Sequence, residues 1–106
     1  MTHDEHLLTI AAEECAELAQ RLSKALRFGL HEIQPGQPHS NRERIIAEYA
    51  DLKAAMWMIG IGDDDVDCTV VAAKRAKVEH FLAYSRACGT VEPETPDPWQ
   101  GKEPKA

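Results

Sequence analysis

AAEECAELAQRLSKALRFG, residues 11–29, combines an apolar helix face with three closely spaced carboxylates. Its apolar residues recur at intervals of three and four, the period of an amphipathic helix. Glu13, Glu14 and Glu17 lie within about one helical turn, and like charges this close destabilise a helix by about 0.2–0.5 kcal/mol per pair. The stretch therefore predicts a helix whose carboxylates have a role other than stabilising that helix.

The same helix extends toward the N-terminus. Thr2 and Glu5 have the spacing of a capping box, so we expect the helix to begin near residue 3. Gly29 marks its end. Residues 30–40 contain two prolines and a glycine, which predicts a loop. The apolar stripe of the helix consists of Leu8, Ala11, Cys15, Leu18, Leu22 and Leu26.

A second helix is expected from about residue 41 to 59, because Ser40 and Glu43 repeat the capping-box spacing and Gly60 follows. Its apolar residues point in almost every direction around the axis, which is typical of a helix buried on all sides. They are Ile45, Ile46, Tyr49, Leu52, Met56, Trp57, Met58 and Ile59. The other helices of so short a chain cannot enclose it, so we expect a homo-oligomer, either a dimer or a tetramer.

A third helix is expected to follow Asp63, Asp64 and Asp65, whose charges suit the positive end of a helix dipole, and to end at Gly89. No segment shows the alternation typical of a strand, so the predicted fold class is all-α. We expect one domain over residues 1–89 and a proline-rich, disordered tail over residues 90–106.

The composition narrows the function classes. The 106 residues include 12 basic and 18 acidic side chains, a net charge of −6, without a basic cluster. This balance argues against stable binding to nucleic acid, which needs clustered cations. The three cysteines have neither metal-site nor disulfide spacing. No apolar run is long enough to cross a membrane and no signal peptide is visible, so we expect a cytoplasmic protein without a membrane partner.

Two carboxylate pairs share one spacing. Glu14 and Glu17 are three residues apart on the first helix, and Glu48 and Asp51 are three apart on the second. On a helical wheel Arg21 continues the line of the first pair. If the pairs face each other, four partly desolvated carboxylates surround one small volume, which suits Mg²⁺. A single carboxylate pair on a helix is usually a solvated acidic face, and the residues themselves leave both interpretations open.

These residues carry a resemblance to a known family. EECAELAQRLSKALRFG followed by NRERIIAEYADLKA resembles the MazG-like family of all-α nucleoside triphosphate pyrophosphohydrolases, particularly the short single-domain versions of bacteriophages and bacteria. The family signature is ExxE, a loop and ExxD, and the resemblance covers roughly residues 5–88. Thirty residues separate Glu17 from Glu48, slightly more than the family usually has, and the surplus lies in QPGQPHS, residues 34–40.

The resemblance implies a MazG-like helical bundle, which we expect homo-oligomerisation to complete because the second helix is apolar on all sides. It implies cleavage of the α–β phosphate bond of a (deoxy)nucleoside triphosphate with Mg²⁺, more than one ion per site, and Mn²⁺ as a substitute. A nucleoside monophosphate and pyrophosphate would be released, in control of the dNTP pool or in house-cleaning. The implied metal ligands are Glu14, Glu17, Glu48 and Asp51. Glu14 would thus act in catalysis, and Glu13 could orient or deprotonate the attacking water, or be only a solvated neighbour.

Five further residues are candidates for binding the substrate. Lys24, on the carboxylate face of the first helix, could hold a phosphate or form an ordinary salt bridge. Arg27 could do the same, although cations are expected near a helix C-terminus in any case. Lys74 and Lys77 could close over the pyrophosphate end or form a solvated face. Asn41 could contact base or sugar, or bond locally next to the helix cap.

A function from another class also fits the sequence. A non-catalytic helical module that dimerises and binds a protein partner would use the same apolar faces. Its carboxylates would then merely be solvated.

Overall fold

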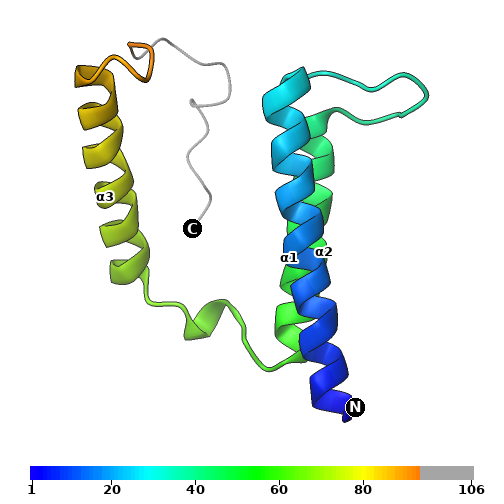
Figure 1. Cartoon of the computed structure of the whole chain (residues 1–106). Coiled ribbons are helices and arrows are strands. Elements are labelled where there is room, and N and C mark those ends of the chain that lie inside the picture. The colour runs from blue at the N-terminus through cyan, green and yellow to red at the C-terminus, as the bar shows by residue number, and fades with distance from the viewer. Residues whose placement is uncertain (94–106) are drawn as a thin grey trace. The chain divides into compact units, whose positions relative to one another are not determined.

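The computed structural model describes residues 1–93, which contain three α-helices and one short 3₁₀-helix (Figure 1). They are α1 (His3–Phe28), α2 (Asn41–Met58), η1 (Asp63–Asp65, the 3₁₀-helix) and α3 (Cys68–Ala87). No strand occurs within residues 1–93, and the all-α prediction is confirmed. The chain divides into two compact units, Met1–Asp65 and a second that begins at Val66. The predicted disordered tail lies, from residue 94 on, outside the described residues.

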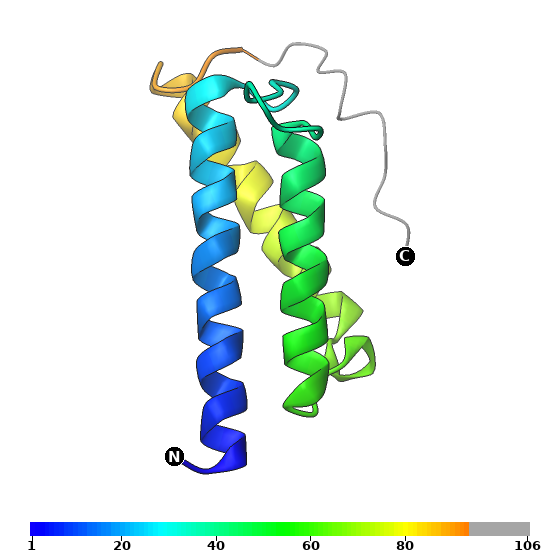
Figure 2. The same ribbon diagram turned by 90° about the vertical axis from the view of Figure 1, so that its right-hand side faces the viewer.

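The first unit is a hairpin in which α1 and α2 run antiparallel and side by side (Figures 1 and 2). α1 begins with the predicted capping box. The hydroxyl of Thr2 accepts a hydrogen bond from the backbone N–H of Glu5 at 3.1 Å, and the Glu5 carboxylate accepts one from the backbone N–H of Thr2 at 3.3 Å. These reciprocal bonds satisfy two N–H groups that a helix end otherwise leaves without a partner.

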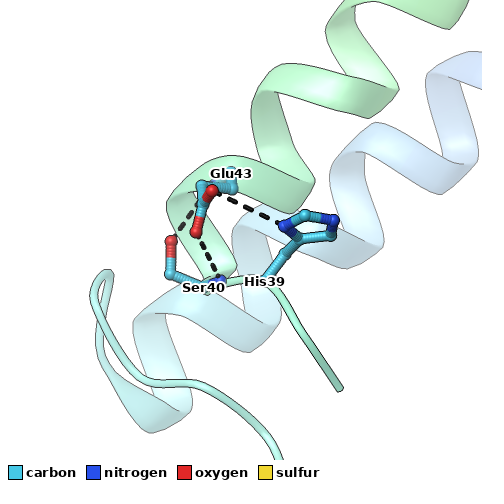
Figure 3. A network of polar contacts seen from close by, with 3 residues as sticks. All are labelled: His39, Ser40 and Glu43. Carbon is cyan, nitrogen blue, oxygen red and sulfur yellow. Dashed lines mark hydrogen bonds and ion pairs between the residues drawn. The ribbon is translucent and has the colours of Figure 1, made fainter.

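The cap of α2 adds a third residue (Figure 3). The backbone N–H of Ser40 donates to Glu43 Oε1 at 3.0 Å, and that of Glu43 donates to Ser40 Oγ at 3.2 Å. His39 Nδ1 lies 3.5 Å from the other oxygen of the Glu43 carboxylate. The hydrogen bonds from Ser40, with a smaller contribution from His39, lower the pKa of Glu43. α2 therefore begins where the sequence predicts, with a carboxylate held in its charged form.

Asn41 ties the connecting loop to both helices. It is only 3% exposed, and its side-chain amide donates to the carbonyl oxygen of Gly29 at 2.8 Å and to Glu32 Oε1 at 3.0 Å. Two backbone bonds close the same loop, from Asn41 to Glu32 at 3.0 Å and from Arg42 to Leu30 at 2.8 Å. Gly29 has a φ of 104°, which residues with a side chain rarely adopt. The structure thus shows the local hydrogen-bonding role considered for Asn41.

The face of α1 that packs on α2 differs from the predicted apolar stripe. Leu7 and Ala11 are buried, and Glu14, Leu18 and Arg21 are half-buried. Four residues of the stripe stay exposed: Leu8, Cys15, Leu22 and Leu26. A single partner helix covers only a narrow seam, and this seam runs along the line of charged residues beside the stripe.

Within the first unit, α1 covers only part of α2. The buried residues of α2 are Asn41 and Ala55, while four large side chains are at least half exposed: Ile46, Tyr49, Trp57 and Met58. The hairpin therefore leaves much of the apolar surface of α2 uncovered.

The three aspartates expected at the start of the third helix do not form its N-terminus. Asp63–Asp65 form η1, and Asp63 pairs with Lys53 at 3.0 Å. The N-cap of α3 is Asp67, whose Oδ1 accepts hydrogen bonds from the backbone N–H and hydroxyl of Thr69 at 2.8 and 2.7 Å. These bonds lower the pKa of Asp67. The prediction was wrong because a helix is capped by the acid whose extended backbone lets it reach the first N–H groups, not by the densest run of acids.

The second unit contains α3, which buries none of its side chains. Its exposed large apolar residues are Val70, Val71, Val78, Phe81 and Tyr84. In the described part of the chain no helix combines the length and apolarity needed to span a membrane.

Candidate metal centre

Three glutamates converge on the seam of the hairpin. Glu14 and Glu17 come from α1 and Glu48 comes from α2, and each contributes a carboxylate oxygen to a group whose atoms all lie within 4.8 Å of one another. The spacing of three residues places the two α1 glutamates on one face of that helix. The antiparallel partner then supplies the third carboxylate.

The register of the two helices pairs the sequence motifs in reverse order. Glu17 meets Glu48, and one turn toward the start of α1 the charge of Asp51 acts on Glu14. Asp51 is exposed and its oxygens are not part of the group of three. The structure thus brings together three of the four predicted metal ligands and leaves the fourth at the edge of the same site.

Burial and mutual repulsion act on these carboxyls together. Desolvation raises the pKa of Glu14, and the negative charges of Glu17, Asp51 and Glu48 raise it further. Desolvation also raises the pKa of Glu48, as do hydrogen bonding to Glu17 and the charges of Glu17 and Asp51, while the charge of Arg21 lowers it. The charged forms of both glutamates are therefore disfavoured until a cation compensates them.

Two of the carboxylate oxygens lack a protein partner. Oε2 of Glu14 and Oε2 of Glu48 are buried without a hydrogen bond, and a buried polar atom left unsatisfied costs about 1–3 kcal/mol. Carboxylate oxygens of this kind are the ligands that Mg²⁺ prefers in proteins. The donor set therefore fits this ion. Glu13 is exposed on the neighbouring flank of α1 and lies outside the group of three.

Three of the predicted substrate-binding residues share a pocket at the loop end of the hairpin. Lys24, Arg27 and Asn41 line a cavity of about 450 Å³ together with Phe28 and three loop residues, Glu32, Gln34 and Pro35. The guanidinium of Arg27 lies 5.0 Å from the centre of the Phe28 ring, a cation–π contact. This pocket combines cations with an aromatic face.

The remaining two candidates belong to the second unit. Lys74 and Lys77 line a groove of about 390 Å³ on α3, with Val78, Phe81, Leu82 and Ser85. Among the described residues of this unit, the lining of the groove is otherwise mainly apolar and includes no carboxylate.

Sequence reasoning missed one residue at the site, Arg44 of α2. Arg21 of α1 and Arg44 of α2 line a cavity of about 360 Å³ that Glu17 and Glu48 also line. Arg21 was placed on the carboxylate line, but nothing about α2 alone indicated that Arg44 lies opposite. The available signal is the mirrored spacing, since each arginine is four residues from a glutamate on its own helix.

Comparisons of the chain with protein-family models, with curated proteins and with solved structures found no match.

Proposed function

We propose that this chain is a Mg²⁺-dependent nucleotide pyrophosphohydrolase of the MazG-like type, acting on a (deoxy)nucleoside triphosphate in the cytoplasm. The observation that carries the proposal is the group formed by Glu14, Glu17 and Glu48, with buried and unpartnered oxygens on two of them. An acidic group of this kind across a helix seam is costly without a cation. With a bound cation, the acidic group becomes a site for a phosphorylated ligand.

Different residues of the hairpin would bind the metal ion, accept a proton from water and bind the substrate. The three glutamates would hold Mg²⁺, with Asp51 within electrostatic reach of two of them. When bound, Mg²⁺ would neutralise phosphate charge and make water a better nucleophile. Glu13, exposed on the adjacent flank, would accept a proton from that water. Lys24, in the pocket further along α1, would bind the substrate.

The proposal includes assembly into a homo-oligomer, a dimer or tetramer. Large apolar side chains are exposed on α1, on α2 and along the whole of α3. Leaving each of them in water forgoes about 1.5–3 kcal/mol, and extended exposed apolar surface marks an interface. A second copy would complete the helical bundle that a single hairpin leaves open.

A second function is supported by the same exposed surface. A non-catalytic module that dimerises and binds a partner would also leave Trp57, Met58 and the face of α3 available in a single chain. It would not account for the two unpartnered carboxylate oxygens at the seam.

Product analysis separates the two functions. The protein is incubated with a panel of nucleoside and deoxynucleoside triphosphates and Mg²⁺, beside Glu48→Gln prepared identically to exclude contaminating phosphatases. Release of a nucleoside monophosphate and pyrophosphate by the wild type alone supports the enzyme. Orthophosphate as the sole product, or no turnover of any nucleotide, contradicts it.

A further inference from the structure

We propose that Arg21 and Arg44 form an anion pocket for the two phosphates that leave as pyrophosphate, and that Gln34 of the loop orients Arg44 in this pocket. The inference deepens the proposed function and rests on it for the identity of the anion. The inference also assigns a role to the loop at residues 34–40, which makes the connection between the two helices longer than is usual in the MazG-like family.

The arginine pocket adjoins the carboxylate group. Glu17 and Glu48 line this cavity of about 360 Å³ as well as belonging to the group of three glutamates. A ligand in the cavity would therefore contact both the arginines and any ion held by the glutamates. Without an ion the carboxylates would repel an anion from the cavity, so we expect anion binding to depend on Mg²⁺.

Arg21 has unused capacity to donate hydrogen bonds. Its Nη1 is buried without a hydrogen-bond partner, and among residues 1–93 no carboxylate lies within ion-pair distance of its guanidinium. A buried donor on a charged group is stable only if something accepts from it. The planar guanidinium matches the oxygens of a phosphate, to which it can donate two parallel bonds.

Arg44 is held in place by a neutral group. Its Nη1 donates to Gln34 Oε1 at 3.1 Å. The amide holds the side chain without forming an ion pair with it, whereas a carboxylate at the same position would neutralise its charge. Two arginines at one cavity repel each other, and an anion between them reverses that cost. Gln34 is thus a positioning residue that acts through Arg44.

The order of charges along the seam fits an extended polyphosphate. The carboxylate group comes first, the arginine pair follows one turn further along α1, and Lys24 lies in the next pocket. If the α–β bond lies at the carboxylate group, the leaving phosphates reach the arginines. Both arginines would then stabilise the charge that develops on the leaving group.

The test measures binding of inorganic pyrophosphate to the full-length protein in excess Mg²⁺ by isothermal titration calorimetry. We expect Arg21→Gln and Arg44→Gln each to weaken binding about tenfold or more, as for a lost hydrogen bond to a charged group. Arg75→Gln is the matched control, because Arg75 lies on the exposed surface of α3, where it pairs with Glu79. Affinity for Mg²⁺ alone should not fall in either pocket variant. Arg21→Lys, which keeps the charge beside Glu48, replaces Arg21→Gln if the latter does not fold.

The positioning role of Gln34 has its own readout. Gln34→Ala should weaken pyrophosphate binding about threefold, with no further loss when Arg44 is already glutamine, because the two residues act as one unit. A loop residue of purely structural importance would instead give additive effects and a lower melting temperature.

The outcomes separate this inference from the proposed function. Unchanged pyrophosphate affinity in both arginine variants, or no binding by the wild type, overturns the arginine pocket even if nucleotides are hydrolysed. Arginine-dependent binding by a protein that turns over no nucleotide upholds the pocket and refutes the proposed activity.

Discussion

Glu17 of α1 and Glu48 of α2 face each other across the hairpin seam with carboxylate oxygens within 4.8 Å. Two acids at this separation are unfavourable neighbours, because their charges repel and Glu48 is partly desolvated. The contact becomes favourable when a divalent cation lies between the carboxylates. The stability of the protein and the activity that we propose for it should therefore both respond to the charge at these two positions.

Removing one of these charges should separate activity from stability. We expect Glu17→Gln to make the metal-free protein no less stable and to reduce the proposed turnover about 100-fold or more, since a proposed metal ligand is lost. Mg²⁺ at 100 times its Kd should stabilise the wild type by about 2.7 kcal/mol and the variant far less. Thermal denaturation with EDTA and with Mg²⁺ measures this, with Glu79→Gln on α3 as the control. Near-normal rates in Glu17→Gln and also in Glu48→Gln would rule out the metal centre.

The raised pKa values of Glu14 and Glu48 predict a pH dependence of the metal-free protein. Both lie above the ordinary value of 4.5 in the folded state, so above pH 4.5 the folded protein binds more protons at these sites than the unfolded chain. Their contribution to stability is fully present below pH 4.5 and is lost as pH rises through the raised values. Melting temperatures measured in EDTA should fall as the pH rises from 4.5 through the raised pKa values. The fall should be less steep in the double variant Glu14→Gln/Glu48→Gln. Equal slopes for the two proteins would contradict the assignment.

The cap of α2 should respond to pH in the opposite direction. Hydrogen bonds from Ser40 lower the pKa of Glu43, so the contribution of Glu43 to stability is present above pH 4.5 and is lost as pH falls through the lowered value.

Ser40→Ala removes the cap and should cost about 0.5–2 kcal/mol in the free energy of unfolding. Urea denaturation at pH 7 measures the loss. The exposed loop variant Gln37→Ala, which removes no cap, should change stability much less, and equal losses would argue against the cap as the cause.

The exposed apolar residues of α2 predict the effect of a new charge. Trp57 is 58% and Met58 63% exposed in a single chain. If a second copy covers them, Trp57→Glu or Met58→Glu should dissociate or unfold the protein, while Gln37→Glu in the loop should do neither. Sedimentation equilibrium at low micromolar concentration reports the mass. A wild type that is monomeric, folded and active under these conditions would refute the homo-oligomer.

The sequence predicted what depends on local interactions. Both capping boxes, at Thr2 and at Ser40, follow from residues three apart, and both helices begin where these boxes place them. The seam of α1 was not predictable in the same way. Its most regular apolar residues, such as Leu22 and Leu26, remain exposed, and the helix packs through a line that includes Glu14.

The arginine pocket depends on a register that no single helix encodes. Periodicity shows which residues share a face of α1, and it therefore placed Arg21 beside the glutamates. That Arg44 lies opposite follows only from how α2 is positioned by the loop. The spacing of residues on α1 was thus enough to place Arg21 at the candidate site. Placing Arg44 there required the pairing of the two helices.

The closure of the loop by Asn41 has a consequence for how the chain finds its native alignment. Along the seam the three glutamates lie within 4.8 Å of one another, and Glu17 and Glu48 share a cavity with two arginines. Without ligands the mutual repulsion of the glutamates opposes this alignment of the two helices. The hydrogen bonds from Asn41 to Gly29 and Glu32 join the two helices at the loop end and so help to hold their register. Loosening the loop should therefore let an empty hairpin sample other registers, and a bound cation should favour the register that brings the glutamates together.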